Sequence, residues 1–218
     1  MPVRYPATDP PWLRPVAIGG ALFVLLGAVA LVTRPTAEPA AAADERTAIA
    51  LLRSLRSAEG HFAEALWVDT DRDGRGEFGF LGELAGSARL RLDGLGRLGA
   101  ALLPEPLLPL SFALVRDKTA DHGAYLVQVF LPGADGSWAA EADDGGGAGV
   151  MIACDAAEEH FRAYAWPAAG SHARRAFYID ETGAVRAFAT GDRRFEGHDR
   201  PLPAGAIDDT ALAWTAVK

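Results

Sequence analysis

The stretch WVDTDRDGRGEFGF, residues 67–80, holds the side chains whose types and spacing best fit a chemical site. Carboxylates alternate with other residues at Asp69, Asp71 and Asp73, and Glu77 follows after two glycines. Calcium takes about six to eight oxygen ligands, and a tight loop supplies them from its first, third and fifth positions, a carbonyl at the seventh, and the ninth. The spacing therefore predicts a calcium loop. Its predicted ligands are Asp69, Asp71, Asp73, Glu77 and the carbonyl oxygen of Arg75.

The twelfth position of this loop departs from the calcium pattern. Phe80 stands where a bidentate glutamate would complete the ligand shell, so we expect weak binding, with a Kd of roughly 10⁻⁴ to 10⁻³ M. The alternative is a polar turn, in which the aspartates bond to their own backbone and Gly74 and Gly76 take positive φ. In both cases we expect Trp67, Phe78 and Phe80 to fix the loop to the core.

Other patterns of catalytic or ligand residues are less complete. The histidines are spread without an HExxH pair, and Cys154 and His160, with acidic residues between them, leave a soft-metal cluster as an alternative. The glycines at 141–150 lack the Lys-Ser/Thr ending of a phosphate loop, and no Gly-x-Ser-x-Gly elbow occurs. We therefore expect a protein that is not an enzyme, with a hydrolase of unrecognised site as a further alternative.

Composition excludes one class of partner. The chain has 218 residues and a formal net charge of −8, and its 21 lysines and arginines are scattered, whereas nucleic-acid binding needs a clustered basic face. Half of the residues are apolar, which suffices for one core and a membrane segment. With one cysteine, Cys154, no intramolecular disulfide can form.

Residues 16–33, VAIGGALFVLLGAVALVT, contain no charged side chain. In a helix they would extend about 27 Å, close to the thickness of a hydrocarbon core. We therefore predict a single-pass anchor in the cytoplasmic membrane, and Arg4 and Arg14 before it favour a cytoplasmic N-terminus. A cleaved signal peptide is the alternative, because the small residues at 37–45 would suit a peptidase.

The anchor sets the expected organisation of the chain. Pro35 and Pro39 follow it, and because each lacks a backbone donor we expect the membrane helix to stop there. The predicted parts are a short cytoplasmic segment at 1–15, the anchor at 16–33, a Pro/Ala-rich linker at 34–43 and an extracytoplasmic domain at 44–218.

Asp44 is placed to cap a helix over about residues 45–66. Apolar residues recur there at helical spacing, which predicts an amphipathic helix with one buried face. The expected stripe consists of Leu51, Leu55, Ala58, Phe62 and Leu66.

The remainder of the domain predicts antiparallel strands. β-Branched and aromatic residues indicate a strand at 124–131 and a hairpin with strands at 174–179 and 184–189. Between them, Asp155 is placed to cap a helical turn that leads into a short strand ending at Pro167. One helix followed by such strands predicts an α+β fold, with the amphipathic helix packed across one face of an antiparallel β-sheet.

The segments LRSLRSAEGHF, DTDRDGRGEFGFLGELAG, AYAWP and AFYIDETGAV, in this order, resemble type IV pilin-like and pseudopilin-like proteins of the bacterial envelope. The resemblance covers roughly residues 45–190 and implies a pilin-like periplasmic domain whose partners are envelope proteins or like subunits. Pilin subunits begin their apolar helix with a glutamate, and residues 16–33 contain none. We therefore expect a non-enzymatic, membrane-anchored relative used for assembly or protein interaction, and as the alternative a calcium-dependent binding module that uses residues 69–77.

Overall fold

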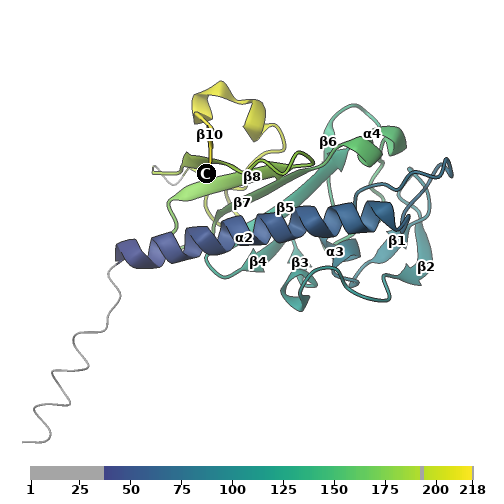
Figure 1. Ribbon diagram of the computed structural model, residues 1–218, viewed down its shortest axis with the longest axis horizontal. Helices are drawn as coiled ribbons and strands as arrows, with labels where there is room; N and C mark the ends of the chain where they lie inside the picture. Colours follow the sequence, from purple (N-terminus) through teal and green to yellow (C-terminus); the bar gives the residue numbers. More distant parts are fainter. Residues whose placement is uncertain (1–36, 192–193, 218) are drawn as a thin grey trace, which may run out of the picture. The chain divides into compact units, whose positions relative to one another are not determined.

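A long helix, α2 (Ala37–Glu64), lies across a large antiparallel sheet (Figure 1). The computed structural model describes residues 37–191 and 194–217. Within them, the predicted combination of a helix with an antiparallel sheet is confirmed. The predicted anchor at 16–33 lies outside this part of the chain, and no helix inside it is both long and apolar enough to cross a membrane.

The helix α2 begins earlier than the sequence predicts. It starts at Ala37, so Asp44 lies inside the helix and is not its cap, and residues 37–43, which we assigned to the linker, are helical. Pro39 is the third residue of the helix. The first four N–H groups of a helix have no intrahelical partner, so proline is tolerated at that position without the loss of a hydrogen bond.

The predicted stripe of α2 is buried except at its last member. Leu51, Leu55, Ala58 and Phe62 belong to the core, whereas Leu66 is 47% exposed. The helix ends at Glu64 and Leu66 has a φ of +55°, so the chain has already turned away from the helix axis.

The remaining helices and strands are short. The strands are β1 (Arg89–Arg91), β2 (Leu98–Leu102), β3 (Val115–Arg116), β4 (Thr119–His122), β5 (Tyr125–Pro132), β6 (Trp138–Ala140), β7 (Arg162–Pro167), β8 (Arg175–Asp180), β9 (Arg186–Ala189) and β10 (Thr215–Ala216). The helices are α3 (Leu81–Leu84), α4 (Cys154–Glu159) and the 3₁₀ turns η1 (Leu110–Phe112), η2 (Ala206–Asp208) and η3 (Thr210–Leu212).

The large sheet is antiparallel throughout and has the order β10-β9-β8-β7-β5-β4-β3. The strand β6 pairs with the end of β5, beyond the part that β4 covers, and β1 and β2 form a separate hairpin. The predicted strand at 124–131 corresponds to β5, and the predicted hairpin corresponds to β8 and β9. Gly183 in its turn has a φ of +77°, which glycine adopts without strain.

Both faces of the sheet are buried. Side chains that alternate along β5, such as Val127 and Val129, belong to one core with side chains of α2. This helix contacts β7 and β8. Their neighbours on the opposite face, such as Leu126 and Phe130, form a second core with residues near the C-terminus. That core contains Tyr164, Trp166, Tyr178, Phe188, Phe195 and Leu202, with Trp214 packed against it.

A buried ion pair lies at the end of the molecule where α2 stops. Arg91 of β1 donates from Nη1 to Glu77 Oε2 over 2.8 Å and from Nε to Glu83 Oε1 over 3.1 Å. All three side chains are buried from solvent. Although burial opposes the charge of Arg91, the two carboxylates raise its pKa above the ordinary value.

Two more glutamates are buried beside this pair. Glu59 of α2 accepts a hydrogen bond from Gly79 N (2.8 Å), and Glu141 accepts from Gly82 N (3.1 Å) and Gly146 N (2.9 Å). The Oε1 atom of each is buried without a hydrogen-bond partner. Burial raises the pKa of Glu59 and raises that of Glu141 to about 8, so Glu141 is mostly protonated at neutral pH.

Candidate metal centre

The acidic loop runs from the end of α2 to α3, and its aspartates bond to its own backbone. Asp71 Oδ1 accepts from Asp73 N (3.2 Å), Asp73 Oδ1 accepts from Arg75 N (2.8 Å), and Asp69 Oδ2 accepts from Gly74 N (3.2 Å). Gly74 has a φ of +89°, as the polar turn predicts, whereas the predicted positive φ at Gly76 is wrong. These are the contacts expected of a polar turn.

The same aspartates also converge. One carboxylate oxygen from each of Asp69, Asp71 and Asp73 lies within 4.8 Å of the others. Two oxygens that bind one Ca²⁺ at about 2.3–2.6 Å lie at most about 5 Å apart, so the three could hold one ion. Asp71 and Asp73 are exposed and Asp69 is half-buried, so the group is open to solvent.

Glu77, the predicted ninth-position ligand, is held elsewhere. Its Oε2 pairs with buried Arg91, and its Oε1 accepts hydrogen bonds from the amide of Thr70 (3.0 Å) and from the Thr70 hydroxyl. Glu77 is fully buried and is absent from the acidic groups formed by the described residues. The burial of Arg91 explains this, because a buried guanidinium requires a carboxylate partner.

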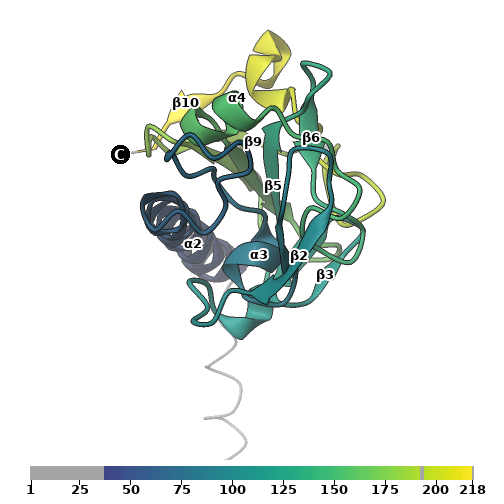
Figure 2. The ribbon, with the colours of Figure 1, turned by 90° about the vertical axis from the view of Figure 1, so that its right-hand side faces the viewer.

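Arg75 joins the loop to α4. Its side chain is 56% exposed, and its Nη1 lies 3.0 Å from Glu158 Oε2 while its Nη2 donates to Glu159 Oε1 over 3.2 Å. Nearby, Phe78 N donates to Ala157 O over 2.8 Å. The loop therefore lies against α4, as Figure 2 also shows. The predicted use of the Arg75 carbonyl oxygen stays a prediction.

The helix α4 supplies a second acidic group. Oxygens of Asp71, Asp155 and Glu158 lie within 4.8 Å of one another. The predicted cap at Asp155 is wrong: Ala153 is the N-cap residue, and Asp155 lies in the first turn. Asp155 and Glu158 are three residues apart, which places them on the same face of the helix. The three-residue spacing of Asp155 and Glu158 could have been read from the sequence as an acidic face of a helix. The sequence near them does not indicate which loop that face contacts.

The electrostatics reflect the crowding of carboxylates. Desolvation, and then contact with the Asp155 carboxyl group, raise the pKa of Asp71. Burial, and then repulsion from Asp73, raise the pKa of Glu158, and Arg75 offsets this only in part. Negative charge therefore exceeds what Arg75 neutralises at this position.

The alternative soft-metal cluster is not formed among the described residues. His160 Nδ1 pairs with Glu181 Oε1 over 3.0 Å, and Cys154 Sγ lies 2.9 Å from the hydroxyl oxygen of Thr70. Neither side chain belongs to the acidic groups described above. The oxygen ligands of this centre suit hard cations such as Ca²⁺ rather than zinc.

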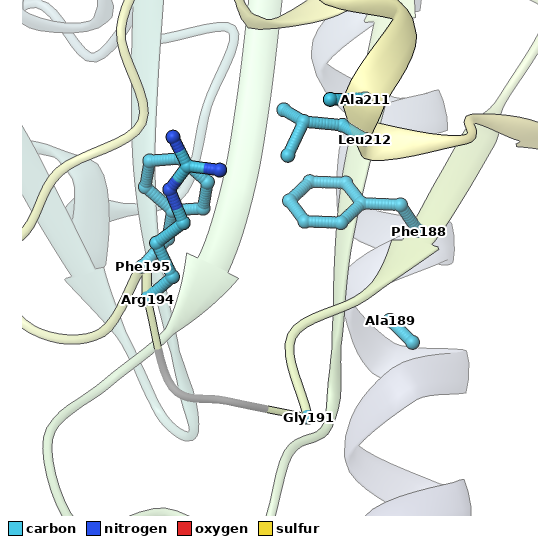
Figure 3. A pocket seen from close by; sticks show the side chains of 7 residues that line it. All are labelled: Phe188, Ala189, Gly191, Arg194, Phe195, Ala211 and Leu212. Atoms are coloured by element: carbon cyan, nitrogen blue, oxygen red, sulfur yellow. The ribbon is translucent and has the colours of Figure 1, made fainter.

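Away from the acidic loop, a hollow of about 190 Å³ lies beside β9 (Figure 3). Phe188 faces Leu212 there, and the Phe188 and Phe195 rings meet edge-to-face at 5.9 Å. Arg194 lies over the Phe195 ring at 5.3 Å. Phe188 and Phe195 belong to the second core, and Leu212 packs against it. No acidic side chain is among the described residues that line the hollow, so it is not a candidate metal site.

A comparison of the chain with protein families, curated proteins and solved structures finds no match.

Proposed function

We propose that this chain is a non-enzymatic, single-pass envelope protein, whose pilin-like domain serves assembly or protein interaction outside the cytoplasmic membrane. The observation that carries the proposal is the order of elements: a charge-free segment at 16–33, then a helix that begins at Ala37 and packs on an antiparallel sheet. In this arrangement α2 is part of the packed domain, and the partners are envelope proteins or like subunits. This order is the one that the resemblance to pilin-like proteins implies.

Fractionation of cells that express the full chain tests this proposal. We expect the chain in the membrane fraction, resistant to alkaline extraction, with the domain accessible to protease from the outer side of the cytoplasmic membrane. The intact mass distinguishes an uncleaved anchor from a cleaved signal peptide. Recovery of the full-length chain from the aqueous fraction would refute the anchor, and turnover of a small compound would refute the non-enzymatic role.

A second candidate function is calcium-dependent binding through the acidic loop. The convergence of Asp69, Asp71 and Asp73 favours it. A ligand that binds only the folded state stabilises it by RT ln(1 + [L]/Kd). With a Kd of roughly 10⁻⁴ to 10⁻³ M, about 10 mM CaCl₂ should stabilise the protein by about 1.4–2.7 kcal/mol, and a chelator should reverse the effect. No change in the melting temperature at this concentration would remove the candidate.

A further inference from the structure

We propose that the cation site extends onto helix α4, where Asp155 and Glu158 join Asp71 as ligands, so that one Ca²⁺ ties the acidic loop to this helix. The inference rests on the calcium-binding function proposed above and changes its ligand set. Glu77 is excluded, because it is buried against Arg91. The acidic residues of α4 take its place.

Glu158 provides the observation that points to a ligand. Its side chain is 2% exposed, yet neither carboxylate oxygen accepts a hydrogen bond. Arg75 approaches Oε2 as an ion pair over 3.0 Å, and Oε1 is buried without a hydrogen-bond partner. A buried carboxylate oxygen without a partner is costly, and a cation that supplies one removes this cost.

The geometry connects the two acidic groups through Asp71. A carboxylate oxygen of Asp71 lies within 4.8 Å of oxygens of Asp69 and Asp73 in the loop group, and one lies within 4.8 Å of oxygens of Asp155 and Glu158 in a separate group with α4. Carboxylates in irregular arrangement suit Ca²⁺, which accepts about six to eight oxygens, better than Mg²⁺, which requires a near-ideal octahedron.

Arg75 takes the place of the cation when none is bound. Its guanidinium neutralises part of the charge on Glu158 and Glu159, and more than half of its side chain is exposed. It can therefore swing into solvent without crossing the core. Cation entry then exchanges an arginine contact for direct coordination, and the loop stays attached to α4.

Calorimetric titration of the full-length chain in mild detergent with CaCl₂ tests the inference. We compare the wild type with Asp155→Asn and Glu158→Gln, and use Glu159→Gln as the matched control, since Glu159 carries the same charge on the same helix but lies outside the group. Loss of a ligand should raise the Kd by about tenfold or more in each of the first two variants, and the control should change it by less than about threefold.

The outcomes separate the inference from the function on which it rests. If the wild type binds Ca²⁺ and both α4 variants bind it as the Glu159→Gln control does, the inference is overturned and a loop-only site stands. If the wild type takes up no Ca²⁺ at about 10 mM, the calcium-binding function fails as well.

Melting with and without calcium guards against a folding defect. Asp155 is exposed, so its substitution should leave the fold intact. For Glu158→Gln we expect equal or greater stability in chelator and a reduced response to calcium. A structural role alone would give the reverse result, lower stability in chelator with the calcium response retained.

Discussion

Glu141→Gln tests whether the buried glutamates set the pH dependence of stability. The pKa of Glu141 rises from an ordinary 4.5 to about 8 because the side chain is buried. The folded protein therefore binds this proton more tightly than the unfolded chain does. The stability that results is fully present below about pH 4.5, falls as the pH rises through about 8, and is absent above it.

The expected magnitude follows from the shift. About 3.5 pKa units correspond to about 5 kcal/mol between the acidic and alkaline limits. Glutamine is neutral at every pH, its oxygen can still accept from Gly82 and Gly146, and its amide group would take the place of the unpartnered Oε1. At about pH 5 we expect the variant to lie within about 1 kcal/mol of the wild type.

Urea unfolding from about pH 5 to pH 9, followed by tryptophan fluorescence, gives the free energy of unfolding at each pH. We expect the variant to become the more stable protein as the pH rises, by several kcal/mol at about pH 9. Glu59 contributes its own pH dependence to both proteins, and because the charge of Glu141 helps to raise the pKa of Glu59, this contribution cancels only in part in the difference. Glu105→Gln, at an exposed glutamate, is the control. Parallel curves for wild type and Glu141→Gln would refute the reasoning.

Three further substitutions test the buried ion pair, the loop and the cation site. Arg91→Met should lower the free energy of unfolding by about 3–5 kcal/mol, measured by urea unfolding at neutral pH, because it leaves buried carboxylates without their counter-charge. Gly76→Ala should lower the melting temperature markedly, because a methyl group there would lie 2.0 Å from the carbonyl oxygen of Ala63. Arg75→Gln should lower the Kd for Ca²⁺ about fivefold in calorimetry. The guanidinium of Arg75 lies beside Glu158, and its removal abolishes about 1 kcal/mol of repulsion between this positive charge and the bound ion.

Each of these substitutions has a control and a contrary result. Arg97→Met removes an ion pair with Asp93 in which the arginine side chain is 73% exposed, and it should cost at most about 1 kcal/mol. An equally small cost for Arg91→Met would contradict the importance of burial. Gly205→Ala places its methyl group where no atom lies within 4 Å, so it should leave the melting temperature unchanged. An unchanged or higher Kd in the Arg75 variant would mean that this side chain does not compete with the cation.

The elements that the sequence predicts well are those with a strong local pattern. β5 is apolar except at Gln128, and the hairpin of β8 and β9 combines two apolar-rich strands with Gly183 at its turn. The stripe on α2 likewise follows from helical spacing alone. Each of these signals lies within a short window of the chain, so no knowledge of the tertiary fold is needed to read it.

The errors concern features decided by distant residues. Glu77 has the right spacing for a metal ligand, but it becomes the counter-charge of Arg91, which lies in another element. The acidic face of α4 meets the loop only in the folded chain, where carboxylate oxygens of Asp155 and Asp71 lie within 4.8 Å of each other although the residues are far apart in sequence. Helix boundaries failed for a different reason: proline is permitted in a first turn, so Pro39 did not mark the break that its chemistry suggested.

The large sheet ends on both sides in two-residue strands, β3 and β10. Strands this short offer few free backbone groups to a passing chain, so strand addition and edge-to-edge aggregation have little to start from. If copies lie close together on a membrane surface, this protection matters most at high local density. Contacts between copies would then form through side chains on α2 and the loops, and mutations that alter such contacts should leave the sheet itself unaffected.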